Sequence, residues 1–109
     1  MSPLLCMTRL EQLHQFLEED PNDPFNIYAL AIEYQKINAG EALKLFERIL
    51  TDHQNYLPVY YTLGKFYERT GNYAQASQTF ATGIEKARLM RESKAQRELQ
   101  SALDELMFE

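Results

Sequence analysis

The chain has 109 residues, of which 45% are apolar and 25% are charged, and its formal net charge is −5. These values are typical of a soluble globular protein, and the length favours one domain over residues 1–109. The negative charge argues against nucleic-acid binding, which requires clustered Lys and Arg to displace phosphate counterions. No apolar stretch approaches the roughly 20 residues that span a bilayer, so we expect no membrane partner.

The N-terminal segment gives an expectation about the cellular compartment. It contains no basic region followed by the apolar run of a secretory signal peptide. Cys6 is the only cysteine, so no internal disulfide can form, which fits a reducing compartment. We therefore expect a cytoplasmic protein in which Cys6 is a tail thiol.

The first helix is predicted over residues 8–20. Thr8 and Glu11 have the spacing of a capping box, in which two side chains satisfy free backbone N–H groups at a helix start. Phe16 falls on the apolar face of this segment. Pro21 cannot continue the helical hydrogen-bond ladder, so the helix should end before it.

A pair of helices is predicted next. Asp23 followed by Pro24 is typical of an N-cap with proline in the first turn. This helix should end near residues 38–40, where Asn and Gly permit a tight reversal. A third helix then carries the apolar residues of 42–50.

Three more helices are predicted in the second half, after the polar break at residues 51–55. Gly71 followed by Asn72 indicates a helix-ending glycine and the N-cap of the next helix. Ser93 and Gln96 have the spacing of a second capping box, which predicts a last, one-sided helix. No segment has the alternating pattern of a strand.

The sequence contains an internal repeat. Segment 28–34 aligns with segment 61–67, and later pairs continue the match with one additional residue between them. The matched pairs are Leu30 with Leu63, Tyr34 with Tyr67, Ala42 with Ala76 and Phe46 with Phe80. Such a period indicates stacked structural units, each of which buries its apolar face on its neighbours.

The second copy resembles the tetratricopeptide repeat family through Tyr60, Leu63, Gly64, Tyr67, Gly71, Tyr73, Ala76 and Phe80. The first copy matches at Ile27, Leu30, Ala31, Tyr34, Ala42 and Phe46. The resemblance implies an all-α fold, a right-handed α-solenoid of antiparallel helix pairs with about six helices. The resemblance covers about residues 20–90, as repeat 1 (23–55) and repeat 2 (56–90). From their own sequence patterns, we expect the flanking segments to form an N-terminal half-repeat helix (8–20) and a C-terminal capping helix (93–108).

Small residues at Ala31, Ala42, Gly64 and Ala76 should let paired helices approach closely, because larger side chains there would overpack the contact. The chain offers little for catalysis or metal binding. His14 and His53 are far apart in the sequence, and neither has a cysteine partner or metal-binding spacing. Neither a phosphate-binding glycine loop nor a nucleophile–base set is present, so we expect no cofactor, no metal and no enzymatic activity.

The family resemblance implies a protein-binding adaptor whose concave groove, lined by the first helix of each pair, accepts a peptide or partner segment. The groove positions carried over from the family are Tyr28, Ile32, Lys36, Tyr61, Lys65 and Arg69. The three cations in this set favour an acidic peptide. Two alternatives remain: Tyr28 and Tyr61 only pack against neighbouring helices, or the chain is a structural unit that forms homo-oligomers through its terminal helices.

Overall fold

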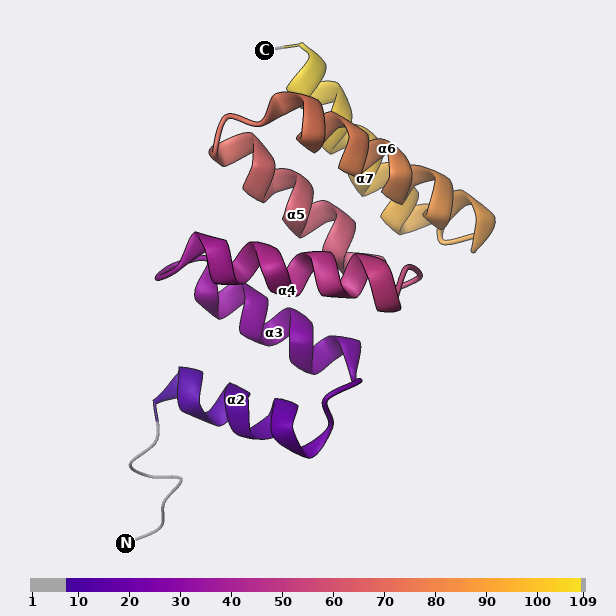
Figure 1. Cartoon of the computed structure of the whole chain (residues 1–109). Coiled ribbons are helices and arrows are strands. Elements are labelled where there is room, and N and C mark those ends of the chain that lie inside the picture. The colour runs from indigo at the N-terminus through magenta and orange to yellow at the C-terminus, as the bar shows by residue number, and fades with distance from the viewer. Residues whose placement is uncertain (1–7, 109) are drawn as a thin grey trace, which may run out of the picture. The chain divides into compact units, whose positions relative to one another are not determined.

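The computed structural model describes residues 8–108, so the tail position expected for Cys6 lies outside the described residues. Within this range the chain forms six helices and no strand, which confirms the all-helical repeat fold (Figure 1). The helices are α2 (Arg9–Glu19), α3 (Pro24–Tyr34), α4 (Ala39–Asp52), α5 (Pro58–Arg69), α6 (Tyr73–Leu89) and α7 (Ser93–Met107). None of them is long and apolar enough to cross a membrane.

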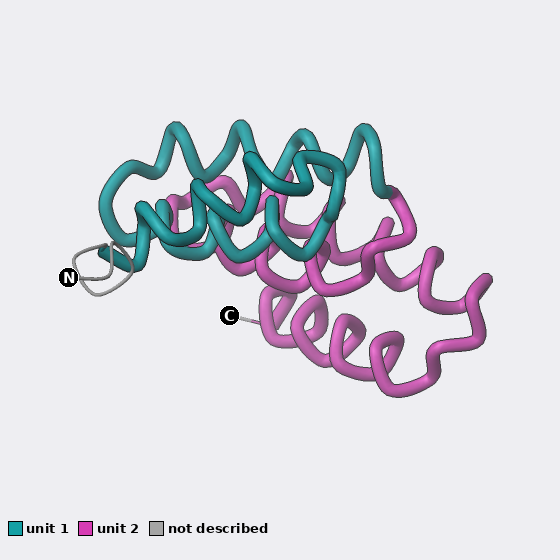
Figure 2. Tube along the Cα trace, turned by 90° about the horizontal axis from the view of Figure 1, so that it is seen from below, with its two compact units in different colours: residues 1–53 teal, residues 54–109 magenta. Residues whose placement is uncertain are grey.

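The helices belong to two compact units, which Figure 2 shows in different colours. Unit 1 spans residues 1–53 and contains α2, α3 and α4, and unit 2 spans residues 54–109 and contains α5, α6 and α7. Consecutive helices within each unit run in opposite directions (Figure 1). The boundary between the units lies two residues before the boundary expected between the repeats.

In unit 1, α3 packs against both α2 and α4. The buried apolar residues of unit 1 are Leu13, Ile27, Leu30, Ala31, Ala42, Phe46 and Ile49. Polar contacts add to this packing between α2 and α3. The Asn26 side-chain amide donates to the carbonyl oxygens of Phe16 and Asp20 at the end of α2, each of which also accepts a backbone N–H. His14 Nε2 and the Tyr34 hydroxyl lie 2.8 Å apart in a hydrogen bond.

Two predicted helix starts in unit 1 are confirmed. Thr8 Oγ1 accepts a hydrogen bond from the Glu11 backbone N–H at 3.1 Å, and Asp23 Oδ1 accepts one from the Phe25 N–H at 2.9 Å. The apolar face predicted for the first helix is only partly correct, because the Phe16 side chain is exposed while Leu13 is buried.

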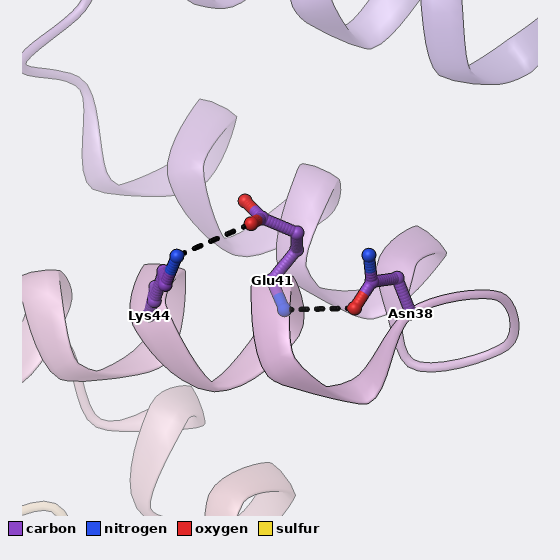
Figure 3. A network of polar contacts seen from close by, with 3 residues as sticks. All are labelled: Asn38, Glu41 and Lys44. Carbon is purple, nitrogen blue, oxygen red and sulfur yellow. Dashed lines mark hydrogen bonds and ion pairs between the residues drawn. The ribbon is translucent and has the colours of Figure 1, made fainter.

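The reversal predicted near residues 38–40 lies earlier than expected. Helix α3 ends at Tyr34, and Asn38 is the N-cap of α4, where its Oδ1 accepts from the Glu41 N–H at 3.2 Å (Figure 3). Glu41 also pairs with Lys44 at 3.3 Å. Because the Asn38 side chain caps the N–H of Glu41, the helix has already begun before Gly40, which lies inside the first turn of α4 instead of in the reversal.

In unit 2, α6 packs against α5 and α7, and α5 also contacts α7. Two glycines make these contacts close. A Cβ on Gly64 would lie 2.3 Å from the Phe80 ring, and a Cβ on Gly83 would lie 2.5 Å from Tyr60 Cβ and 3.0 Å from Leu99. Small residues are therefore required where these helices meet, as predicted for Gly64.

Helices α5 and α6 end in the same way. After α5, the N–H groups of Gly71 and Asn72 donate to the carbonyls of Glu68 and Tyr67, with Gly71 at φ +83°. This is a Schellman motif, in which glycine readily adopts the left-handed conformation. After α6, Arg91 takes the same place at φ +58°.

Of the two caps predicted in unit 2, the position of Asn72 is confirmed and the cap of α7 is wrong by one residue. Asn72 occupies the N-cap position of α6, but its side-chain amide donates to Thr70 Oγ1 and caps no backbone group. The N-cap of α7 is Glu92 instead of Ser93. Because Glu92 follows Arg91 directly in the Schellman motif, the helix already begins at Ser93, whose hydroxyl is then one position too late to cap it.

The predicted core of α5 is correct but incomplete. Tyr60, Leu63, Gly64 and Tyr67 are buried as expected, while Val59 and Phe66 are also buried. Buried residues therefore occupy more than one face of α5, whereas the repeat pattern specifies only one.

Candidate partner-binding site

The three candidate residues of unit 1 lie on or just beyond α3. Tyr28 and Ile32 are half-buried on the helix, whereas Lys36 is exposed in the turn that follows Tyr34. The Lys36 ammonium lies 3.7 Å from the Glu33 carboxylate. Its charge is therefore partly compensated within the same segment.

In unit 2, Tyr61 presents a partly open aromatic ring on α5. The residue is 42% exposed. One side of its ring contacts Phe80 of α6, with the ring centroids 6.4 Å apart and the planes tilted by 52°. Tyr61 thus both packs against the neighbouring helix and leaves surface for a partner.

Lys65, one turn after Tyr61, is surrounded by opposite charge and by the aromatic ring. Its ammonium lies 3.6 Å from Glu68 Oε1, 3.8 Å from Glu105 Oε2 of α7 and 5.8 Å from the centre of the Tyr61 ring. The last distance is within the range of a cation–π interaction. The Glu68 oxygen is buried and, within the described part of the chain, has no hydrogen-bond partner.

A pocket of 420 Å³ lies beside this ring, between α5 and α7. It is lined by Tyr61, Glu98, Ser101, Ala102 and Glu105. The α7 residues recur at the i, i+3, i+4 and i+7 positions that share one helix face. Two carboxylates therefore face the pocket, and its lining contains no basic residue. We call this space, with its five lining residues, the α5–α7 pocket.

Arg69, the last candidate residue, is exposed at the C-terminal end of α5. The pocket residues of α7 were not among the predicted site residues, because the sequence pattern identified this helix only as a cap with one apolar face. The repeat period contains a signal that could have located them. One further step of 33 residues leads from Lys65 to Glu98 and places α7 where the first helix of a third pair would lie.

The structure also locates the two histidines. His14 bonds to Tyr34, and His53 is the C-cap of α4. Among residues 8–108, no group of three or more His, Cys, Asp or Glu side chains is placed to hold a metal ion.

Comparison with known proteins gives consistent matches. Residues 34–103 match the family model described as Tetratricopeptide repeat. A tetratricopeptide repeat domain protein from Salinibacter ruber, solved by NMR, is 45% identical to this chain; the match covers 80% of this chain and 89% of that one, with a TM-score of 0.76. A crystal structure of such a protein from the same organism is 44% identical, with coverages of 78% and 97% and a TM-score of 0.72.

A solution structure from Bordetella parapertussis is 22% identical, covers 93% of this chain and 89% of that chain, and has a TM-score of 0.79. At this identity it supports the fold alone. Among curated proteins, none matches this chain significantly.

Proposed function

This chain belongs to the tetratricopeptide repeat family, and on that premise we propose that it is an adaptor that binds a peptide or a partner segment. The family fold is generally a protein–protein interaction module, and the family is generally non-catalytic. The proposed contact residues lie on the first helix of each pair or just beyond it: Tyr28, Ile32 and Lys36 in unit 1, and Tyr61, Lys65 and Arg69 in unit 2.

The observation that carries the proposal is the position of Tyr61. Its ring is partly exposed and borders a pocket whose 420 Å³ is within the roughly 300–1,000 Å³ of ligand-binding pockets. Tyrosine is enriched among the residues that dominate binding energy, because it combines a large apolar area with a polar end. A partner side chain that covers this ring would bury that area.

A peptide-display screen against the purified full chain tests the proposal. Affinities of selected peptides are then measured by fluorescence anisotropy for the wild type and for the Tyr61→Ala and Arg69→Ala variants. We expect Tyr61→Ala to weaken binding about tenfold or more, the scale of an interface hot spot.

Tyr73→Ala is the matched control for this screen. Tyr73 is 59% exposed at the start of α6, the second helix of its pair, so its removal should leave affinity unchanged. The proposal fails if no peptide is selected, or if Tyr61→Ala and Arg69→Ala bind every selected peptide as tightly as the wild type does.

A second candidate function, a homo-oligomeric structural unit, rests on a different observation. The end of α7 exposes Met107 and Phe108, and exposed apolar side chains are candidates for self-association. Light scattering over a range of protein concentrations tests this function. A dimer that becomes a monomer in the Met107→Ser/Phe108→Ser variant would support it, and a monomer at all concentrations would exclude it.

A further inference from the structure

The α5–α7 pocket differs in charge from the site expected from the sequence. Lys65 was expected among the three cations that favour an acidic peptide, but its ammonium lies within 4 Å of two carboxylates, Glu68 and Glu105. Glu98 lines the pocket as well and makes no ion pair with the described residues. Two carboxylates therefore flank the Lys65 ammonium and a third lines the adjoining pocket, so that these side chains together carry an excess of negative charge.

The excess of negative charge favours a cationic ligand, and the Tyr61 ring favours one as well. The face of an aromatic ring carries negative charge density and attracts cations. The Lys65 ammonium already lies over the Tyr61 ring, at 5.8 Å from its centre. The ring and the carboxylates of Glu98 and Glu105 thus offer the groups that recognise a guanidinium or an ammonium.

From this charge complementarity we infer that the α5–α7 pocket binds a basic side chain, arginine or lysine, of a partner peptide, with its cationic group between Tyr61 and the Glu98 and Glu105 carboxylates. The inference rests on the proposed peptide-binding function and specifies the chemistry of the ligand. The Ser101 hydroxyl can accept a further hydrogen bond from the bound cation, and the small side chain of Ala102 leaves room for the aliphatic stem.

Substitution of Lys65 tests whether the ligand is a cation or an anion, because it should change the affinity for the two in opposite directions. A ligand cation competes with the Lys65 ammonium for the Tyr61 ring and for the Glu105 carboxylate. Removal of that ammonium in Lys65→Gln should therefore strengthen binding of a cationic ligand. If the site instead recognises an acidic peptide, the same substitution removes an attractive charge and weakens binding.

The first experiment uses small probes and the full chain labelled with ¹⁵N. Amide spectra are recorded during titration with n-butylguanidinium, with n-butylurea, its neutral analogue of similar shape, and with butyrate, an anion. We expect saturable shifts at Tyr61 and at residues 98–105 with n-butylguanidinium alone. Equal shifts with n-butylurea, or shifts with butyrate instead, would overturn the inference.

Three variants make the assignment specific. We expect Glu98→Gln/Glu105→Gln to raise the dissociation constant for n-butylguanidinium at least about fivefold, since two charge contacts are lost. Tyr61→Leu keeps an apolar side chain without the aromatic face and should raise the constant about twofold or more. Lys65→Gln should lower it. The spectrum of each variant also reports whether the fold is kept.

The control is Glu18→Gln/Glu47→Gln, which changes the net charge equally at two exposed positions in unit 1 and should leave the dissociation constant unchanged. An equal effect of this control and of the pocket variant would mean that only overall charge matters, which overturns the inference.

The display screen separates this inference from the proposed function. Selected peptides that are acidic and bind more weakly to Lys65→Gln would overturn the inference and leave the adaptor function standing. If no peptide is selected while n-butylguanidinium binds with the expected variant pattern, the adaptor function fails and the pocket's cation preference stands. Basic peptides that lose affinity when arginine is replaced by the neutral analogue citrulline would support both.

Discussion

At the scale of single residues, the ring of Phe80 limits the room for a side chain at position 64. A Cβ at Gly64 would lie 2.3 Å from the ring of Phe80, which is fully buried. We expect Gly64→Ala to lower the free energy of unfolding by up to about 2 kcal/mol. Overpacking of about 1–3 kcal/mol exceeds the gain of about 1 kcal/mol that alanine brings to a helix interior.

Gly40 provides the matched control for this prediction. A Cβ there would have only Asn38 Oδ1 nearby, at an ordinary 3.5 Å. Gly40→Ala should therefore stabilise the protein by up to about 1 kcal/mol through helix propensity alone. Urea unfolding followed by circular dichroism measures both changes, and a Gly64→Ala variant at least as stable as the wild type would contradict the close approach of α5 and α6.

Arg91 adopts a left-handed backbone conformation that suits glycine better. Its φ is +58°, and it holds the position after α6 that Gly71 holds after α5. We expect Arg91→Gly to raise the free energy of unfolding by about 1 kcal/mol, because the left-handed strain of a non-glycine residue is removed. Gly71→Ala should lower it by a similar amount although its Cβ would meet nothing within 4 Å. Changes of the opposite sign in thermal unfolding would refute this assignment.

The two helix ends also show what local sequence can and cannot reveal. Gly71 was predicted as a helix end because glycine is the usual residue in that conformation. The same motif at Arg91 contains no glycine, so the sequence offered Ser93 and Gln96 as a capping box instead. The helix was placed correctly, but its N-cap was assigned one residue too late.

At the scale of helices, the apolar face of α7 was predictable and its polar face was not. Leu99 and Ala102 are buried, as the periodic spacing of apolar residues predicts. That spacing identifies the side of a helix that faces the core. It carries no information on which polar residues meet another helix, so the approach of Glu98 and Glu105 to Tyr61 emerges only from the packing of α5 against α7.

The buried face of α7 leads to a prediction for a truncated chain. Leu99 lies against the position of Gly83 on α6, so removal of α7 uncovers apolar surface on unit 2. Terminal helices of repeat proteins keep such surfaces from solvent. We expect a fragment of residues 1–90 to aggregate, as measured by light scattering at concentrations where the full chain does not scatter. A fragment that stays dispersed and melts cooperatively would contradict the capping role of α7.

At the scale of the whole chain, the repeat period explains why so much of the fold was predictable. The period reports the order of the helices and the places of the small residues, because both recur within each copy. It reports less about the site. Lys36 was expected on a helix but lies beyond the end of α3, and the charge of Lys65 is compensated by carboxylates that include one from α7.

The single domain expected from the sequence can be tested by heat. Each unit holds fewer than about 60 residues, a size at which chains bury a smaller share of their surface than larger domains do and are only marginally stable. We therefore expect the full chain to melt in one cooperative transition, with equal calorimetric and van't Hoff enthalpies. Amide signals of α3 and α6 should then disappear at the same midpoint, and Gly64→Ala should lower that midpoint for both helices. If Gly64→Ala shifts α6 and leaves α3 in place, the two units are independent domains.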